Sequence, residues 1–225
     1  ANTVQDTTSQ HNTRYGMEIT GRSSGNIILH YTIYNNNDEG IHLSGPGGAD
    51  PGQQLISNTV SNNEVEGIYL LNSNNNQLMN NIVQDHGSAG IYVKNSHFNR
   101  FDGNSLINDF LHLVSGSTAN RFNNNIIVGG RLKLDSVVGN VINAMSVREQ
   151  GGRPSNAYDF TRSSENIVLD SESVNAHEYA IRAADSSVNN QFLRFMATPR
   201  LRCYTDKRSR VSITGPDGAS LPCRR

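Results

Sequence analysis

The sequence is short of the features that mark most globular folds. It contains no tryptophan, two cysteines and six prolines, and only 35% of its 225 residues are hydrophobic. No segment keeps a helical period over three turns, which argues against a helical bundle. No apolar run is long enough to span a bilayer, so we expect no membrane span. The sequence also has no zinc-ligand spacing, no phosphate loop and no Gly-x-Ser-x-Gly elbow, so nothing in it indicates a zinc site, a nucleotide site or a serine hydrolase.

A strong net charge is lacking too. The chain carries −1 at pH 7, so no overall field favours nucleic acid, and we expect no nucleic-acid partner. The charge is nevertheless uneven, because residues 194–225 hold eight Lys and Arg against Asp206 and Asp217, a net charge of +6. A basic tail can hold an acidic partner. The plainer interpretation is a solvated C-terminal segment.

Both cysteines, Cys203 and Cys223, fall in this last segment. A bridge between them would close a loop of about 20 residues and stabilise the fold by roughly 3 kcal/mol. Two free thiols are the alternative, but the isolation of the pair favours a disulfide and an oxidising compartment. We therefore expect a secreted or periplasmic protein, and the lack of an Asn-x-Ser/Thr sequon favours a bacterial one.

What the chain has in abundance is asparagine, arranged in a repeat. Residues 66–83 and 89–104 each contain a Gly-Ile-x-Leu-like strand, an Asn/Ser turn, a short apolar segment and a second turn. Equivalent turns recur at a median near 22 residues, which is one turn of a parallel β-helix with three short strands. Asn suits the turn because it tolerates a left-handed backbone and can bond its equivalents in neighbouring coils. These turn positions are Asn26, Gln54, Asn76, Asn99, Asn120, Asn140, Asn166 and Asn189.

The repeat predicts an all-β parallel solenoid of about eight coils. It covers residues 1–197, and a tail of residues 198–225 is expected to cap the last coil, whose strand edges would otherwise be open. Two insertions, at 45–53 and 148–154, are expected to emerge as loops beside the binding face.

One strand per coil presents ionisable and aromatic side chains outward at period two. Aligning these strands places large apolar residues such as Ile68 and Leu70 inward, which fixes the register. The central outward positions are Glu18, His42, Tyr69, Tyr92, His112, Lys133, Asp159 and Arg182. This stripe suits a linear polymer, since Tyr rings offer flat surfaces to sugars and Lys or Arg can pair with uronate carboxylates. Stacking for stability and idle surface charge are the alternative.

Proton transfer on a sugar needs a base with a pKa near neutral and a cation close to the same ring. His112 is ranked first because Tyr92 and Lys94 lie one coil before it and Lys133 one coil after it. The candidate catalytic residues are His112, Tyr92, Lys133 and His42. The candidate substrate-binding residues are Glu18, Tyr69, Lys94, Asp159 and Arg182.

Other candidate groups carry a weaker signal. His86 and His97 fall in turns and are expected to be solvated. Asp50 with Asp38 and Glu39 offers carboxylates for Ca²⁺, although no ligand spacing stands out and no cofactor is required.

Over residues 13–195 the repeat resembles the right-handed parallel β-helix superfamily of carbohydrate-binding proteins and sugar hydrolases. Residues 14–17, Arg-Tyr-Gly-Met, with Arg22-Ser23, are similar to the strand that carries the Asp-Pro-His motif of alginate C5-epimerases. Residues 18–20, Glu-Ile-Thr, stand in place of that motif, so Tyr15 and Glu18 carry over while the proline and histidine do not. The resemblance implies an enzyme that acts on an acidic, uronate-containing polysaccharide by β-elimination or C5 epimerisation. The alternative is a noncatalytic carbohydrate-binding or structural β-helix, or the C-terminal part of a larger protein.

Overall fold

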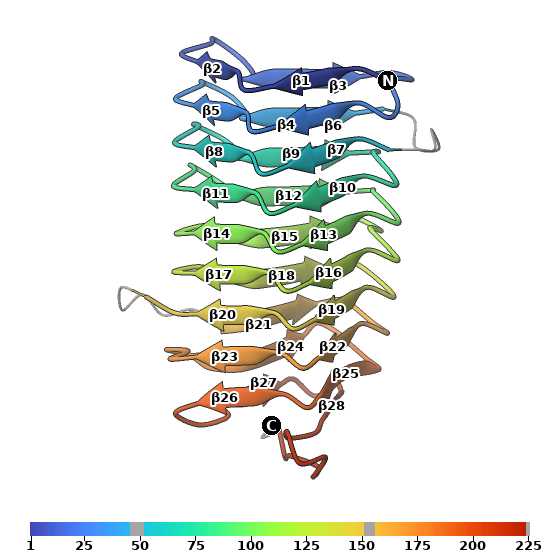
Figure 1. The fold of residues 1–225 in the computed structure, drawn as a ribbon. Coiled ribbons are helices and arrows are strands. Elements are labelled where there is room, and N and C mark those ends of the chain that lie inside the picture. The colour runs from blue at the N-terminus through green and yellow to red at the C-terminus, as the bar shows by residue number, and fades with distance from the viewer. Residues whose placement is uncertain (46–51, 151–155, 224–225) are drawn as a thin grey trace.

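Short strands stack into one solenoid, which Figure 1 shows from the blue N-terminal coil to the red C-terminal one. The computed structural model describes residues 1–45, 52–150 and 156–223. Within them the chain forms 28 strands in three parallel sheets, and each coil adds one strand to each sheet. The predicted all-β parallel solenoid is confirmed, with nine three-strand coils in place of about eight. No helix among these residues is long and apolar enough to cross a membrane.

We name the three faces sheets A, B and C. Sheet A contains β1 (Thr3–Gln5), β4 (Ile27–Leu29), β7 (Gln54–Ile56), β10 (Gln77–Met79), β13 (Arg100–Asp102), β16 (Arg121–Asn123), β19 (Val141–Asn143), β22 (Ile167–Leu169), β25 (Asn190–Leu193) and β28 (Val211–Ile213). Sheet B contains β2 (Thr8–Gln10), β5 (Thr32–Tyr34), β8 (Thr59–Ser61), β11 (Ile82–Gln84), β14 (Ser105–Ile107), β17 (Ile126–Val128), β20 (Ser146–Arg148), β23 (Glu172–Val174) and β26 (Met196–Thr198). Sheet C contains β3 (Met17–Thr20), β6 (Ile41–Ser44), β9 (Ile68–Leu71), β12 (Ile91–Lys94), β15 (Leu111–Val114), β18 (Leu132–Asp135), β21 (Asn156–Thr161), β24 (Tyr179–Ala184) and β27 (Cys203–Thr205).

Sheet C has the register that the sequence predicts. Tyr92 lies between Tyr69 and His112 of the neighbouring strands, while the inward residues Ile91 and Val93 are at most 1% exposed. Apolar side chains fill the interior layer by layer, with Tyr158 and Phe160 in β21 among the largest. A slip of one residue would turn them to solvent. The outward column runs through Glu18, His42, Tyr69, Tyr92, His112, Lys133, Asp159, Arg182 and, in the ninth coil, Tyr204.

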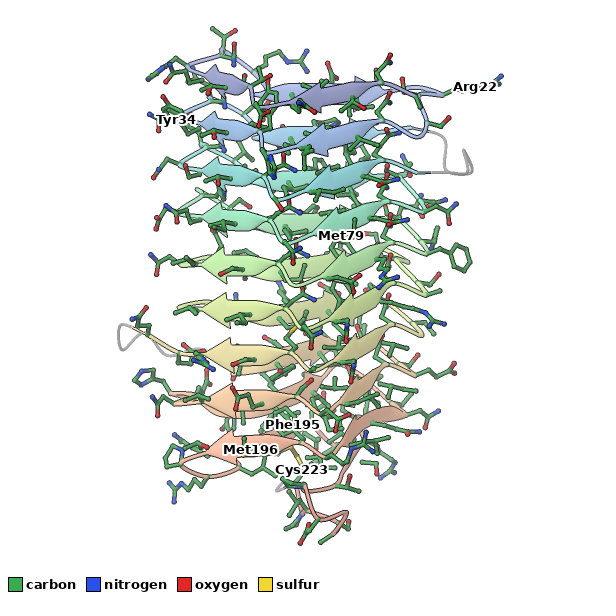
Figure 2. The ribbon with its side chains drawn as sticks, in the orientation of Figure 1. Arg22, Tyr34, Met79, Phe195, Met196 and Cys223 are labelled. Carbon is green, nitrogen blue, oxygen red and sulfur yellow. A yellow bond between two sulfur atoms is a disulfide. The ribbon has the colours of Figure 1, made fainter. Side chains whose placement is uncertain are left out.

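The last segment of the chain begins as part of the solenoid. Strand β27 pairs with β24 and β28 pairs with β25, so this segment continues sheets C and A. The boundary predicted between residues 197 and 198 falls inside β26. The predicted disulfide between Cys203 and Cys223 is present, with 5.0 Å between the Cα atoms. Figure 2 shows Cys223 at the C-terminal end of the stack.

Buried asparagines stack along the turn before sheet A, as predicted, and form what we call the first ladder. In each rung the side-chain oxygen accepts hydrogen bonds from the residue one coil earlier. Asn99 Oδ1, for example, accepts from the backbone N–H of Asn76 at 2.8 Å and from Asn76 Nδ2 at 2.9 Å. The rungs are Asn26, Gln53, Asn76, Asn99, Asn120, Asn140, Asn166 and Asn190.

Two predicted rungs are wrong by one residue. Gln53 makes the ladder contacts, whereas Gln54 already belongs to β7 and is half-buried on its outer side. Asn190 is the last rung, whereas Asn189 has φ +55° and makes the left-handed turn just before it. In both places the predicted spacing is right, but the sequence pattern does not distinguish the residue that bonds between coils from the residue next to it.

A second ladder, in the turn between sheets B and C, consists of Asn12, Asn36, Asn63, His86 and Asp109. His86 Nδ1 accepts the Asn63 backbone N–H at 3.1 Å, so Nε2 carries the proton and donates to the Val60 carbonyl at 3.2 Å. Asp109 Oδ1 accepts the His86 backbone N–H at 3.2 Å, while Oδ2 lies 3.9 Å from His86 Nε2. Burial raises the pKa of Asp109 to about 7 and lowers that of His86 to about 4, so both are mainly neutral between these values.

The expected solvation of the two turn histidines is therefore wrong for His86, whose side chain is fully covered because it replaces a ladder asparagine. His97 is half-buried, and its Nδ1 lies 2.8 Å from Thr118 Oγ1. The loops predicted at 45–53 and 148–154 fall mostly on residues 46–51 and 151–155, which lie outside the described residues.

Candidate functional site

Five rings run along the outer side of sheet C in its first five coils and form what we call the aromatic row. Tyr15 stacks on His42 with 4.6 Å between ring centroids, and His42 meets Tyr69 edge-on at 5.2 Å. Tyr69 and Tyr92 follow at 5.3 Å, and Tyr92 and His112 at 5.1 Å. Strand stacking at about 4.8 Å sets the spacing of the last four rings, because each coil from β6 to β15 adds one ring to the column, whereas Tyr15 comes from the turn before β3. Four of the five rings, all except His42, are half-buried and partly open to solvent.

Carboxyl groups gather beside the N-terminal part of this row, at Glu18, Asp38, Glu39 and Glu66, which we call the acidic cluster. Glu39 and Glu66 occupy the same place in their coils, two residues before the first residue of β6 and β9. Glu39 Oε1 lies 3.4 Å from His42 Nδ1. Glu66 Oε1 accepts a hydrogen bond from Ser88 Oγ at 3.0 Å. Consecutive coils thus bring several carboxyl groups to one edge of sheet C.

Burial shifts the protonation of this cluster. It raises the pKa of Glu39 to about 7, helped by the neighbouring Asp38 carboxylate, and it also raises the pKa of Glu66. Burial lowers the pKa of His42. Glu39 is 6% exposed, and its Oε2 has no hydrogen-bond partner among the described residues. A buried carboxyl group that keeps a proton near neutral pH can serve as a general acid.

His42 lies in the predicted outward column, yet it is only 8% exposed. The cause is Tyr15, which comes from the turn before β3 and covers the imidazole. Arg14 Nη2 in turn donates to Tyr15 Oη at 2.7 Å, with its guanidinium 4.5 Å from the ring centroid. His42 is therefore placed to orient Glu39 rather than to meet solvent freely.

His112, ranked first as a base, is also more enclosed than its outward position suggests. Its ring lies 5.1 Å from Tyr92 and 5.8 Å from Phe110, and Nε2 is buried without a hydrogen-bond partner among the described residues. Burial, with the positive charge of Lys133 nearby, lowers the pKa of His112 to about 4. The imidazole is neutral at pH 7, but its Nε2 is shielded from solvent. The catalytic role of His112 stays a prediction.

The predicted cationic positions fall into two groups. Lys94 and Lys133 form no ion pair with any residue that the structure describes. Arg182, by contrast, binds Asp159, with 2.7 Å between Nη1 and Oδ1, and Asp159 is only 6% exposed. Asp159 and Arg182 neutralise each other, which leaves the two lysines as uncompensated charges on the central coils of sheet C.

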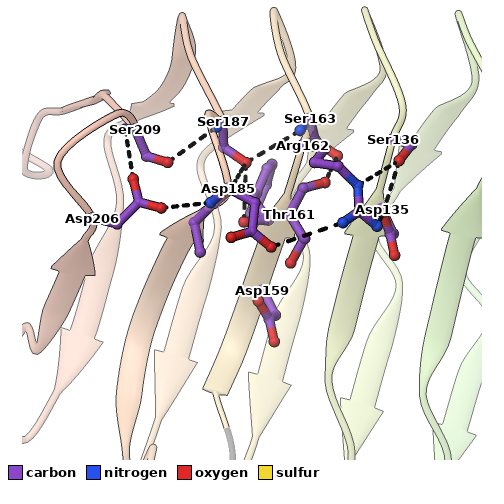
Figure 3. Close-up of polar contacts among 12 residues, drawn as sticks. Asp135, Ser136, Asp159, Thr161, Arg162, Ser163, Asp185, Ser187, Asp206 and Ser209 are labelled. Atoms are coloured by element: carbon purple, nitrogen blue, oxygen red, sulfur yellow. Dashed lines mark hydrogen bonds and ion pairs between the residues drawn. The ribbon is translucent and has the colours of Figure 1, made fainter.

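Figure 3 shows the polar contacts that follow the last strands of sheet C. Arg162 bridges two coils, 2.7 Å from Asp135 Oδ1 and 3.8 Å from Asp185 Oδ2. Asp206 Oδ2 accepts the backbone N–H of Asp185 at 2.6 Å. These charges hold the turns together, so they are engaged in structure rather than offered to a ligand.

The sequence interpretation placed Glu18, His42 and Tyr69 in the candidate site and named Tyr15 through the epimerase resemblance. It missed Glu39 and Glu66 as catalytic candidates, because Glu39 was considered only as a Ca²⁺ ligand. The repeated signature Glu-Gly-Ile, at residues 39–41 and 66–68, was the available signal. It puts a carboxyl group at the same edge of two consecutive coils. The aligned residues 89–91, 109–111 and 130–132 lack that signature. Asp109, the one carboxyl group among them, is buried in the second ladder, so the central coils have no counterpart to the acidic cluster.

No group of three or more His, Cys, Asp or Glu suited to hold a metal occurs in residues 1–45, 52–150 and 156–223. Asp50, one member of the proposed Ca²⁺ set, lies outside the described residues. Asp38 and Glu39 remain beside each other, and a Ca²⁺ site there stays a prediction.

A parallel three-sheet solenoid with a polar column on one sheet defines a β-helix. The family described as "Right handed beta helix region" matches residues 1–127, more than half of the chain, and the protein belongs to that family. The comparison with curated proteins finds no match.

Among solved structures, the chain is similar to catalytic domains of GH87 α-1,3-glucanases. One, in complex with nigerose, has a TM-score of 0.44 and 10% identity, and the match covers 93% of this chain and 63% of that domain. Another, in complex with tetrasaccharides, has a TM-score of 0.30 and 12% identity, covering 93% and 54%. The chain thus spans less than two thirds of these domains, and we draw nothing about activity from the likeness.

Proposed function

We propose that this protein is a polysaccharide-cleaving β-helix enzyme whose substrate lies along sheet C. The observation that carries the proposal is Glu39, a buried carboxyl group with a pKa of about 7 in contact with His42 and among other carboxylates. A titratable group that is shifted by burial and charged neighbours and lies beside a column of outward side chains is a candidate for a functional site. The aromatic row beside it supplies the surface on which the polymer rests.

In the proposed reaction, Glu39 donates its proton to the glycosidic oxygen as the bond from that oxygen to the anomeric carbon breaks. A second, ionised carboxylate activates the water that adds to this carbon, so that one proton is given and one is taken up. The acidic cluster offers Glu18, Asp38 and Glu66 for this role, and single amide substitutions would identify which one acts. His42, held by Tyr15, orients the Glu39 carboxyl group.

A uronate lyase or epimerase is the second candidate, favoured by the unpaired Lys94 and Lys133 beside Tyr92 and His112. The lysines would neutralise a uronate carboxylate while Tyr92 takes the C5 proton. In elimination the C4–O bond then breaks, a C4–C5 double bond forms and the leaving oxygen receives the proton from Tyr92, whereas in epimerisation a proton returns to C5 from the opposite face. Its pKa of about 4 makes His112 a weak base for removing the C5 proton. The acidic cluster also repels a polyanion, which is why we rank hydrolysis first. The disulfide supports the expected oxidising, secreted or periplasmic location.

The test is a panel of neutral glucans, alginate and pectate, assayed for new reducing ends and for the ultraviolet absorbance of unsaturated uronate. Reducing ends without that absorbance mean hydrolysis, whereas the absorbance means β-elimination. On an active substrate, Glu39→Gln should lower kcat at least about 100-fold. Activity should also fall as pH rises through about 7, because Glu39 then loses the proton it donates.

The matched control is Glu64→Gln, which makes the same chemical change at an exposed turn position. It should leave kcat unchanged. Wild-type activity in Glu39→Gln would overturn the assignment of the acid. Polymer binding without any product would instead favour the noncatalytic carbohydrate-binding alternative.

A further inference from the structure

A cleft of about 440 Å³ lies at the C-terminal end of the solenoid, well away from the acidic cluster. It opens between the start of β24 and the last segment of the chain. Its lining combines an aromatic ring, two guanidinium groups and an apolar floor: Tyr179, Arg200, Leu201, Arg202, Cys203, Leu221 and Pro222. Concave sites that join apolar walls with a few convergent polar groups are typical of ligand binding.

The walls of this cleft are fixed before any ligand arrives. The Cys203–Cys223 disulfide ties β27 to the segment that carries Leu221. The Leu221 backbone N–H donates to the Ile213 carbonyl at 2.9 Å, and Leu201 and Leu221 both pack against the hydrophobic core. Binding would therefore cost little ordering of the chain.

The two arginines give the cleft an uncompensated positive charge. Arg202 Nη1 donates to the His177 carbonyl at 2.8 Å, which holds its guanidinium in place without neutralising it. Neither Arg200 nor Arg202 forms an ion pair with a residue that the structure describes. Arg194, in the same basic segment, is different, because Asp170 accepts from its Nε at 2.5 Å and its Nη2 at 2.6 Å.

The aromatic side of the cleft is part of sheet C, along which the substrate is proposed to lie. Tyr179 opens β24, and its ring lies 5.5 Å from that of Tyr204, the last residue of the outward column. β24 is six strands beyond β6 in sheet C, so Tyr179 lies about 29 Å from the Glu39 edge along the axis, at about 4.8 Å per strand. A polymer bound along sheet C would reach this cleft with its far end.

We propose that this cleft binds an anionic sugar residue, with a carboxylate or sulfate ester on Arg200 and Arg202 and the ring against Tyr179. Guanidinium groups bind planar oxyanions through paired, charge-assisted hydrogen bonds, and aromatic rings pack on sugar faces. The assignment deepens the proposed function and rests on it for the path of the polymer. It also fixes the direction in which the polysaccharide lies on the protein, with the anionic end of the polysaccharide away from the acidic cluster.

Calorimetry with three short oligosaccharides of equal length tests the proposal. The three probes are an oligogalacturonate, a sulfated oligosaccharide without carboxylates and a neutral oligosaccharide. The intact protein should bind at least one anionic probe more tightly than the neutral probe, and comparing the two anionic arms separates carboxylate from sulfate ester. The double variant Arg200→Gln, Arg202→Gln should weaken that binding by about tenfold or more. The control variant Lys207→Gln, Arg208→Gln removes the same charge from exposed positions outside the cleft and should change it by less than about threefold.

Failure of both anionic probes to bind, or equal losses in the two double variants, would overturn the cleft assignment. Glu39→Gln should keep the anionic binding. Binding that survives in a protein without any glycan-cleaving activity would defeat the proposed function and leave the cleft standing, so the two failures are distinguishable.

Discussion

The two turn ladders both join consecutive coils by hydrogen bonds, but they use different side chains. In the first ladder, an amide in each coil accepts from the coil before it and donates to the coil after it, as Asn120 does between Asn99 and Asn140. In the second, the amides end at Asn63, and His86 and Asp109 take the next two rungs.

The difference shows what the asparagine amide contributes. His86 Nδ1 accepts the Asn63 backbone N–H, but Asn63 Nδ2 is buried with no acceptor among the residues that the structure describes. Asp109 Oδ2 is also buried and has no hydrogen-bond partner in the described part of the chain. An amide carries donors and an acceptor without charge, so it can bond the coils on both sides, whereas His86 and Asp109 leave polar atoms of this ladder unpaired and can ionise. The first ladder is therefore expected to be stronger and insensitive to pH, and the second weaker and pH-dependent.

The largest expected effect comes from breaking the first ladder at its centre. Asn120→Ala removes the acceptor of the Asn99 N–H and Nδ2 groups and the donor to the Ser96 carbonyl, all of them buried. Leaving these groups unpaired should lower the free energy of unfolding by about 3–5 kcal/mol. Urea denaturation followed by circular dichroism measures the loss. A loss below about 1 kcal/mol would mean that the ladder contacts contribute little beyond the strands.

A smaller effect, with a pH signature, comes from mending the second ladder. Asp109 keeps its proton in the folded state up to about pH 7, so the stability that it contributes is full below the ordinary carboxyl pKa. This contribution declines as pH rises and is lost once pH has passed through about 7. Asp109→Asn cannot ionise and should gain roughly 1–3 kcal/mol over the wild type at pH 8, with little gain at pH 4.

His86 has the opposite dependence, since its lowered pKa makes stability fall as pH drops from about 6.5 towards 4. That term is common to both proteins and cancels in the difference. The reciprocal variant Asn120→Asp is the matched control: it should lose more stability at pH 8 than at pH 5. Equal losses at the two pH values would contradict the role given to the buried carboxyl group.

The smallest effect is expected where an asparagine pair lies on the outer face of a strand. Asn143 Nδ2 donates to Asn123 Oδ1 at 2.7 Å, but both residues are half-buried and can bond to water instead. Asn143→Ala should therefore change stability by about 0.5 kcal/mol or less. Comparing its thermal midpoint with that of Asn120→Ala shows how much of the stabilisation comes from burial of the amide pair and how much from the pair itself.

These ladders also mark how far the sequence could predict the structure. The fold, the register of sheet C and the first ladder follow from a repeat in which one residue type returns at one spacing. The second ladder could not be found this way, because Asn63, His86 and Asp109 share a position but no residue type. Burial of His42 escaped prediction for a related reason. Alternation tells which way a side chain points, but not that Tyr15 from an adjoining turn covers it.

The first ladder has a direction as well as a length. In every asparagine pair, Nδ2 of one coil donates to the side-chain oxygen of the following coil, never the reverse. Amide dipoles aligned head to tail add together, as peptide dipoles do in an α-helix, whereas those of β-strands alternate and largely cancel. The solenoid thereby acquires an electrical axis, negative towards the N-terminal coils and positive towards the C-terminal ones. Here the polarity that a helix draws from its main chain comes from the side chains of one residue type.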